Sequence, residues 1–198
     1  MQVSSDGDPM SIQKTFIVLI VLFVIQALAL WWMGHVLICK CGYVALWYGD
    51  VFASGNSQHL IDWYSFGHVN HGILFYGLFW LIARKKSFRW RMVATMLTGV
   101  IWEVGENTDF VINRFREVTM SLDYYGDSVI NSVADSVFML GGFWLASVVP
   151  VWASVAIVMG TEAYTTLMVR DGLALNTLML ITPIEAVKDW QLQGWTQH

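Results

Sequence analysis

The chain has 198 residues and a mass of 22.5 kDa, and 56% of its residues are hydrophobic whereas only 13% are charged. Soluble domains usually carry about 25% charged residues, so this composition excludes an ordinary soluble fold and indicates a membrane protein. The length leaves room for one all-α domain, a polytopic bundle of five or six spans at about 20 residues per crossing. The net charge of −4 argues against a nucleic-acid partner.

Apolar runs predict the membrane spans in chain order. The first run, residues 15–33, ends in two tryptophans of the kind found at a membrane interface, so we expect a retained helix and not a cleaved signal peptide. Further runs predict spans at residues 63–83, 92–107, 127–149 and 150–169. The last apolar piece, residues 173–184, is short for a crossing, so it is either a sixth span extended toward Trp190 or a re-entrant segment.

Basic residues predict the orientation of these spans. Five of the eleven Lys and Arg residues lie between residues 84 and 91. Because Lys and Arg concentrate on the cytoplasmic side, we expect this connection and the N-terminus to be cytoplasmic, and the loops 34–62 and 108–126 to face the periplasm of a Gram-negative cell. The predicted organisation is a cytoplasmic tail at 1–14, a single transmembrane helical domain at 15–190 and a second tail at 191–198.

Ionisable side chains recur inside the predicted spans. A charged residue at the centre of a membrane helix costs at least about 2.5 kcal/mol, so a cluster of such residues calls for a reason. Counting a helical rise of about 1.5 Å per residue from the cytoplasmic border places six residues in one layer. These six are His68, His71, Glu103, Glu106, Asp135 and Glu162.

The spacing of these residues predicts one polar face on each helix. The two histidines are three residues apart, the two glutamates of the third span are three apart, and Asp127, Asn131 and Asp135 follow at intervals of four. Residues at these spacings share a helix face. Since polar faces turn away from lipid, we expect them to line a pocket in the outer half of the bundle, open to the periplasm and closed below by apolar side chains.

This donor set predicts a divalent metal site. Helix bundles hold metals with inward-facing Glu and His side chains, and without a thiolate or thioether the set suits zinc, iron or manganese better than copper(I). The candidate metal ligands are His68, His71, Glu103 and Asp135. Glu106 or Glu162 would then support a ligand or act as a general base toward water activated by the metal.

Residues near the pocket mouth are candidates for substrate contact. They are Asn107, Asp127, Asn131 and Arg170. Arg170 would bind an anionic headgroup, although a single arginine at a helix end can also snorkel to the interface. Just before the second span, Asp62 is predicted to cap the helix, and His59 is predicted to be exposed.

Cys39 and Cys41 lie in the first outer loop as Cys-Lys-Cys-Gly. The periplasm permits disulfides, so the pair is expected to be two packed cysteines or one tight disulfide, with redox or soft-metal binding as the alternative.

Several functions are compatible with this polar layer. One metal with activated water favours a hydrolase acting on a lipid, lipid-linked or peptide substrate from the outer leaflet. Alternatively, the polar layer holds the bundle of a non-catalytic factor together by hydrogen bonds, and that factor binds lipid or partner helices. Two metals bridged by Glu103 and Glu106 would favour an oxidase or hydroxylase, and the layer would also suit a proton or ion path.

Some motifs are specific enough to indicate relatives. They are Cys39-Lys-Cys-Gly, Asn56-Ser-Gln-His, Asp62-Trp-Tyr, His68-x-x-His-Gly, Trp102-Glu-x-x-Glu-Asn and Leu122-Asp-Tyr-Tyr-Gly-Asp. Through them, nearly all of residues 35–190 resembles an uncharacterised family of alphaproteobacterial inner-membrane proteins, a domain of unknown function. The resemblance implies a multi-pass protein of a Gram-negative inner membrane and implies no activity.

The chain is also similar, over a few positions, to the VanZ-like membrane proteins that are known for glycopeptide resistance. The shared pattern is a His near the start of one span, a Glu late in the next and Asp-x-x-x-Asn opening the one after. VanZ-like proteins usually have Asp-Lys-x-x-His where this chain has Ser65-Phe-Gly-His68. The similarity implies that five residues act as a unit, namely His71, Glu103, Asp127, Asn131 and Asp135.

Overall fold

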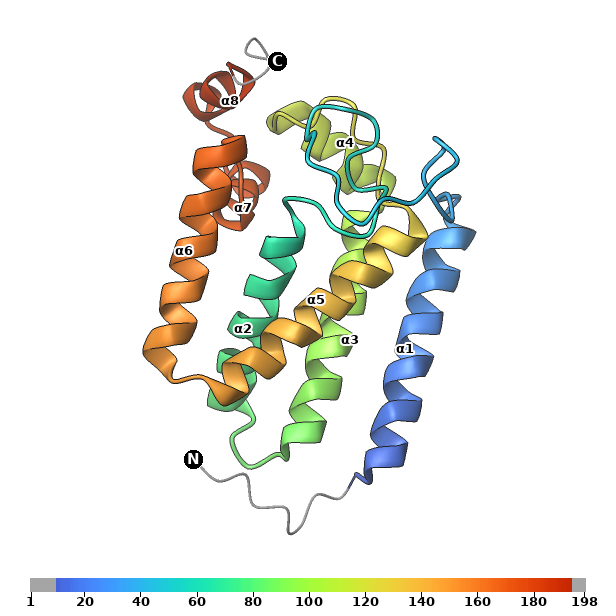
Figure 1. The fold of residues 1–198 in the computed structure, drawn as a ribbon, viewed down its shortest axis with the longest axis vertical. Helices are drawn as coiled ribbons and strands as arrows, with labels where there is room; N and C mark the ends of the chain where they lie inside the picture. The colour runs from blue at the N-terminus through green and yellow to red at the C-terminus, as the bar shows by residue number, and fades with distance from the viewer. Residues whose placement is uncertain (1–9, 194–198) are drawn as a thin grey trace.

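The computed structural model describes residues 10–193. Within this range the chain forms helices and no strand (Figure 1). This confirms the predicted all-α class. The parts of the predicted tails at residues 1–9 and 194–198 lie outside the described residues. Helix α1 begins at Ile12 and helix α8 ends at Leu192, so each helix extends a few residues into a predicted tail.

Five long helices form the body of the molecule, and each coincides with one of the first five predicted apolar runs. They are α1 (Ile12–Trp32), α2 (Ser65–Ile82), α3 (Phe88–Glu106), α5 (Val129–Val148) and α6 (Val151–Val169). Figure 1 shows α1, α2, α3 and α6 along the long axis of the molecule, whereas α5 crosses the bundle obliquely. Because α5 packs against α1, α2, α3 and α6, it connects all the other long helices.

Three short helices gather at one end of the bundle, at the top of Figure 1. They are α4 (Asp109–Val118), α7 (Leu173–Ile181) and α8 (Glu185–Leu192). The segment 108–126, predicted as a loop, therefore contains a helix. The last apolar piece does not form one continuous span toward Trp190, because Pro183 separates α7 from α8 and restricts the residue before it.

Side-chain caps begin four of the helices. Ser11, Ser87, Thr108 and Ser128 each stand at an N-cap, and each side-chain oxygen accepts a hydrogen bond from the backbone N–H three residues later. These bonds satisfy N–H groups that have no partner within the helix. Asp62 was predicted as the N-cap of α2, but the N-cap is Tyr64, which makes no side-chain cap bond. Asp62 lies two residues further upstream, where its Oδ1 accepts from the N–H groups of Tyr64 at 2.8 Å and Ser65 at 3.2 Å.

Two glycines allow α2 and α5 to pack in close contact. A Cβ atom on Gly72 would lie 1.9 Å from the carbonyl oxygen of Met139, and one on Gly142 would lie 2.0 Å from the carbonyl oxygen of Val69. Only glycine fits at either position. The close approach matters because α2 carries both histidines of the polar layer and α5 carries Asp135.

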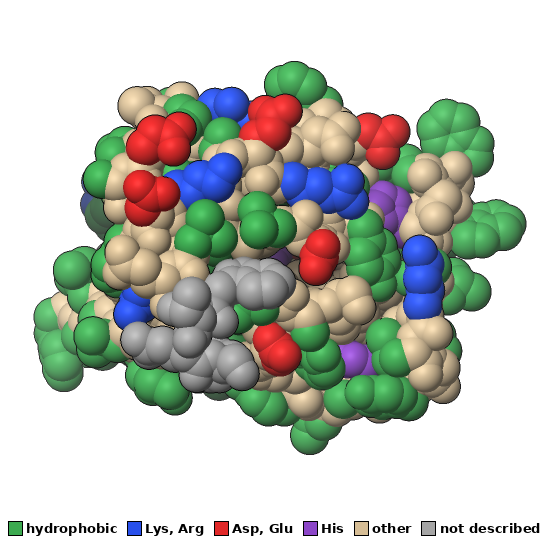
Figure 2. All heavy atoms as spheres, turned by 90° about the horizontal axis from the view of Figure 1, so that it is seen from above, with side chains coloured by type: hydrophobic (Ala, Val, Ile, Leu, Met, Phe, Trp, Pro, Cys, Tyr) green, Lys and Arg blue, Asp and Glu red, His purple; other side chains and the backbone are tan. Residues whose placement is uncertain are grey.

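Two helices among the described residues, α1 and α5, are long and apolar enough to cross a membrane. Large apolar side chains are also exposed along α6, where Val151 is 80% and Leu167 82% exposed. Figure 2, which looks onto the end that carries α4, α7 and α8, shows acidic and basic side chains on this face and apolar side chains around its rim. These features indicate a membrane protein.

The close contact between α2 and α5 predicts the effect of adding one methyl group. Gly72→Ala forces the Cβ against backbone atoms, so we expect the free energy of unfolding to fall by at least about 1–3 kcal/mol. The measurement is thermal unfolding in detergent, followed by tryptophan fluorescence. Gly77→Ala is the matched control on α2, because a Cβ there meets no atom within 4 Å. Equal melting temperatures for the two variants would contradict the close packing.

Candidate functional site

A pocket lies at the end of the bundle where the short helices gather, and its empty volume, including the space at its mouth, is about 810 Å3. The histidines and acidic residues that line it are His68, His71, Glu106, Asp127 and Asp135. The lining also includes uncharged polar residues, as well as aromatic and aliphatic side chains from α3, α4 and α7. The pocket thus places ionisable groups beside apolar surface.

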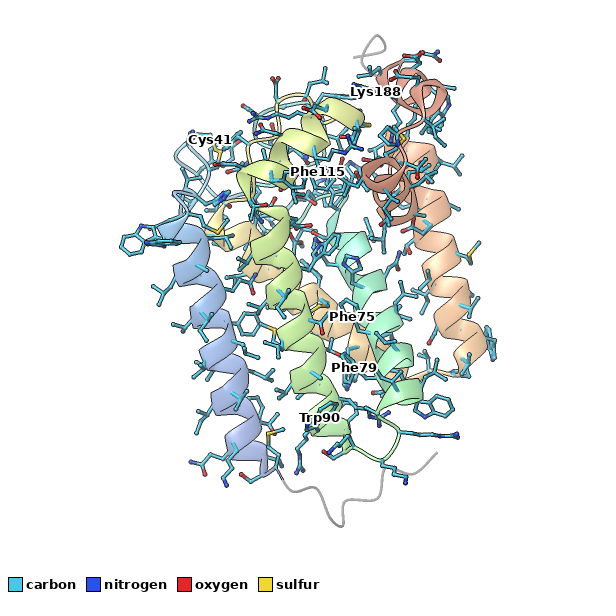
Figure 3. The ribbon with its side chains drawn as sticks, turned by 180° about the vertical axis from the view of Figure 1, so that it is seen from behind. Cys41, Phe75, Phe79, Trp90, Phe115 and Lys188 are labelled. Atoms are coloured by element: carbon cyan, nitrogen blue, oxygen red, sulfur yellow. A yellow bond between two sulfur atoms is a disulfide. The ribbon has the colours of Figure 1, made fainter. Side chains whose placement is uncertain are left out.

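Apolar side chains close the bundle beyond this pocket. His71 stacks on Phe75 with ring centroids 5.7 Å apart, and Phe75 packs against a buried cluster that includes Met96 and Met139. Figure 3 shows Phe75 and Phe79 along α2 on the side away from the short helices, and Phe115 of α4 at the other end. The polar groups therefore face one end of the bundle only.

His68 lies between two buried carboxylates from two other helices. Its Nδ1 is 3.2 Å from Oε1 of Glu103 on α3, and its Nε2 is 3.7 Å from Oδ2 of Asp135 on α5. Glu103 is 2% and Asp135 3% exposed. Serine hydroxyls bind the carboxylate oxygens that do not contact His68. Ser132 donates to Glu103 Oε2 at 2.6 Å, and Ser65 donates to Asp135 Oδ1 at 3.3 Å.

Three ionisable side chains bring potential metal-ligand atoms together. His68, Glu103 and Glu106 each offer a ligand atom, and these atoms lie within 4.8 Å of one another. Asp135 adds an oxygen beside the other nitrogen of the same imidazole. His71 is not part of this group of three, and its ring packs edge to face against His68 at 5.7 Å and Trp102 at 5.4 Å.

Three predicted substrate contacts bind the loops to the bundle. Asn107 and Asp127 exchange two hydrogen bonds, from Asn107 Nδ2 to Asp127 Oδ2 at 2.8 Å and from the Asp127 N–H to Asn107 Oδ1 at 2.7 Å. Asn131 Nδ2 donates to the carbonyl oxygen of His59 at 2.7 Å. Of the three, only Asp127 also lines the pocket, where the Tyr124 hydroxyl donates to its Oδ1 at 3.0 Å.

The structure does not bring Glu162 or Arg170 to His68. Glu162 accepts hydrogen bonds from Asn70 Nδ2 and from the N–H of Ala174 in the first turn of α7, both at 2.9 Å. Arg170 donates to the carbonyl oxygen of Trp190 at 2.8 Å, and its guanidinium lies over the ring of that residue. Both side chains hold the short helices in place.

The outer loop differs from expectation at His59. The sequence predicted an exposed side chain, but only 1% of His59 is exposed. Its ring lies 5.1 Å from that of Tyr43 and 4.7 Å from that of Tyr48, and its Nδ1 accepts the N–H of Ala45 at 3.1 Å. The prediction was wrong because hydropathy does not reveal that a polar loop folds over its own histidine.

Cys39 and Cys41 form a disulfide. This is one of the two expected states of the pair.

Asp171 was not singled out in the sequence, although it is completely buried. It accepts hydrogen bonds from the Tyr64 hydroxyl at 3.0 Å, from Asn176 Nδ2 at 3.1 Å and from Gln191 Nε2 at 3.2 Å, as well as from the N–H of Gly172 at 2.9 Å. Burial raises the pKa of Asp171 to about 7, against the opposing effect of these donors. Asp171 therefore connects α7, α8 and the start of α2 through a titratable group.

Comparison with known proteins gives close relatives. Residues 30–193 match the family described as protein of unknown function (DUF2585). A UPF0314 protein of Paracoccus denitrificans is 54% identical over 177 residues, which is 89% of this chain and 90% of that protein. Those of Rhizobium meliloti and Sphingopyxis alaskensis are 52% identical over 167 residues and 43% identical over 173 residues, covering 84% and 87% of this chain and 85% and 92% of theirs.

No solved structure matches the chain. The relatives confirm the resemblance to an uncharacterised alphaproteobacterial family. The similarity to VanZ-like proteins stays a sequence-based expectation.

The buried Asp171 predicts a pH dependence of stability. Its pKa is about 7 in the folded chain against an ordinary value of 3.8, so the folded state holds this proton more tightly than the unfolded state. The contribution of Asp171 to the free energy of unfolding is therefore most favourable below about pH 4. It falls by about a few kcal/mol as the pH rises to about 7, and it stays constant at higher pH.

Asp171→Asn removes the titration, so we expect the melting temperature of the wild type to fall relative to that of the variant between pH 5 and pH 8. Differential scanning fluorimetry at several pH values measures the difference. A constant difference across this range would refute the assignment.

Proposed function

The chain belongs to the DUF2585 family of proteins of unknown function, and we propose that it is a multi-pass inner-membrane enzyme that binds a divalent cation at His68. The proposed reaction is hydrolysis of a lipid, lipid-linked or peptide substrate at the periplasmic side. One observation carries the proposal: an imidazole at a pocket wall lies between two buried carboxylates from two other helices. Buried ionisable groups are expensive unless they are paired or bind a cation.

The proposed topology has five spans, formed by α1, α2, α3, α5 and α6. Arginine and lysine cluster in the connection between α2 and α3, at the end of the bundle away from the short helices (Figure 1). Arg89 in α3 donates to the carbonyl oxygen of Met10 at 2.9 Å, so α1 begins at the same end. Because basic residues concentrate on the cytoplasmic side, this end is cytoplasmic and the pocket opens toward the periplasm.

The residues fit a divalent cation by chemistry and by spacing. Ligand atoms bound to one zinc ion at about 2.0–2.2 Å lie roughly 3–4 Å apart. The distance of 3.7 Å from His68 Nε2 to Asp135 Oδ2 falls in this range, while Glu103 Oε1 lies 3.2 Å from the other ring nitrogen, Nδ1. Imidazole with carboxylates suits zinc, iron or manganese. His68 is the common member of both pairs.

The other residues have separate roles in the proposed reaction. A bound cation would polarise the bond to be cleaved and make water a stronger acid. Glu106 lines the pocket beside His68 and is the candidate general base that takes the proton from water. Asp127, with Tyr124 bound to it, presents polar atoms nearer the mouth, while Trp63 and Phe115 offer apolar surface to the substrate.

A non-catalytic membrane factor that binds lipid or partner helices is the second candidate. The specific observation in its favour is that Asn107, Asp127 and Asn131 are all hydrogen-bonded within the protein. Polar contacts of this kind hold membrane bundles together without catalysis. A dinuclear oxidase or hydroxylase would differ from both by containing two metal ions per chain.

Metal analysis of the purified protein tests the proposal. After zinc, iron or manganese is supplied, we expect one ion per wild-type chain and loss of that ion in His68→Ala. Glu162→Gln is the matched control, because this residue lies in another hydrogen-bonded group and its variant should keep the ion. Melting temperatures establish that each variant is folded.

Each outcome decides between the candidates. One ion that depends on His68 supports the proposed enzyme. Two irons per chain with visible absorption would replace it with the oxidase. No ion in the wild type, even after supplementation, would leave the non-catalytic factor.

A further inference from the structure

Gln26 is a polar side chain in the middle of an apolar helix. It belongs to α1, which has a mean hydropathy of 2.5 over its most apolar window, and it is completely buried. Burying an amide in such a place is unfavourable unless it is hydrogen-bonded. Its hydrogen bonds lead to the polar site on α3.

The contacts of Gln26 form a short chain that ends at Glu103. Ser136 Oγ donates to Gln26 Oε1 at 2.8 Å. Gln26 Nε2 lies 2.9 Å from the carbonyl oxygen and 2.7 Å from the Oγ of Ser132. Ser132 Oγ in turn lies 2.6 Å from Glu103 Oε2. All four side chains are at least 98% buried.

The direction of each hydrogen bond in this chain follows from the atoms involved. A backbone carbonyl oxygen can only accept, so the Gln26 atom that faces the carbonyl of Ser132 must be the NH2 group. The same NH2 group donates to Ser132 Oγ. The hydroxyl of Ser132 has a single proton, and that proton is therefore available for Glu103 Oε2.

This direction determines how Glu103 meets His68. Since Oε2 accepts from Ser132, the other oxygen of the carboxylate, Oε1, is the one that faces His68 Nδ1 at 3.2 Å. With Glu103 ionised, as it would be beside a bound cation, its Oε1 accepts the Nδ1–H of the imidazole. The lone pair of the neutral imidazole is then on Nε2, which lies on the side of Asp135.

We propose that Gln26 is a positioning residue of the metal site: through Ser132 it fixes Glu103 as the acceptor of His68 Nδ1–H, and it thereby presents His68 Nε2 to the cation. In this arrangement Glu103 orients the ligand and is not itself a ligand. The inference rests on the proposed function and assigns the side of His68 on which the cation binds. Carboxylates that hold a metal-ligating histidine in this way are common in metal sites.

The lining of the pocket supports this assignment. His68, Glu106 and Asp135 line the pocket, whereas Glu103 is absent from its described lining residues. A cation that arrives through the pocket therefore meets His68 and Asp135, and Nε2 is the His68 nitrogen on the side of Asp135. Asp135 is held from behind by Ser65, in the same manner as Glu103 is held by Ser132.

Cobalt(II) titration of the protein in detergent tests the proposal, with the visible spectrum as a readout of coordination. We expect Gln26→Met and Ser132→Ala to weaken cobalt binding about 10- to 100-fold, as losses of such supporting groups do, while one ion per chain is still bound. Because both variants interrupt one chain, the double variant should be no weaker than the worse single variant. Ser147→Ala, at a half-buried serine at the far end of the helix that carries Ser132, is the control and should bind as the wild type does.

A second measurement reads the tautomer of His68 directly in the zinc-loaded protein. Nitrogen-15 NMR of labelled histidines, with His68 assigned by its loss in His68→Gln, reports which ring nitrogen carries the proton. We expect protonation at Nδ1 in the wild type and a mixture of both tautomers in Gln26→Met.

The outcomes separate this inference from the proposed function. If the wild type binds cobalt and loses it in His68→Ala, but Gln26→Met and Ser132→Ala bind it unchanged, the role of Gln26 is wrong and the metal site stands. Complete loss of cobalt in Glu103→Gln, with the fold intact, would make Glu103 a direct ligand and overturn the assignment. No cobalt binding by the wild type would reject the proposed function itself.

Discussion

The organisation of the site depends on one interaction, the enclosure of the His68 imidazole between carboxylates from two other helices. It requires α2 and α5 to approach so closely that Gly72 and Gly142 have no room for a Cβ. It also requires α3 to present Glu103 at the height of His68. The cost of burying these groups is offset only if they pair or bind a cation, because few protein donors reach them. The bundle therefore has a polar centre. In the proposed topology its apolar core lies on the cytoplasmic side of that centre.

The long helices could be predicted because apolar runs of this length have few alternatives to a helix. The helix α4 was missed because the charges of Arg114, Arg116 and Glu117 resemble those of a loop, although Thr108 provides a recognisable N-cap. The break between α7 and α8 was open to prediction from Pro183. What hydropathy cannot supply is the fold of the polar outer loop, and the burial of His59 is the clearest example.

The site could be predicted only in part, because helical rise gives the height of a residue but not its direction around the bundle. Glu162 has the expected helix and faces Asn70, on another side of α2 from the Glu103 contact. Gln26 stands out in the sequence as a polar residue in an apolar run, but its partners could not be predicted, because Ser132 and Ser136 are 106 and 110 residues away in the chain. Long-range hydrogen bonds of this kind follow from the packing of α1 against α5 and have no periodicity to reveal them.

Anomalous diffraction from crystals of the zinc-loaded protein tests most directly whether the polar centre holds a cation at His68. We expect a zinc peak at about 2.0–2.1 Å from His68 Nε2, on the side of Asp135. A peak elsewhere in the chain, or the absence of any peak among α2, α3 and α5, would contradict it.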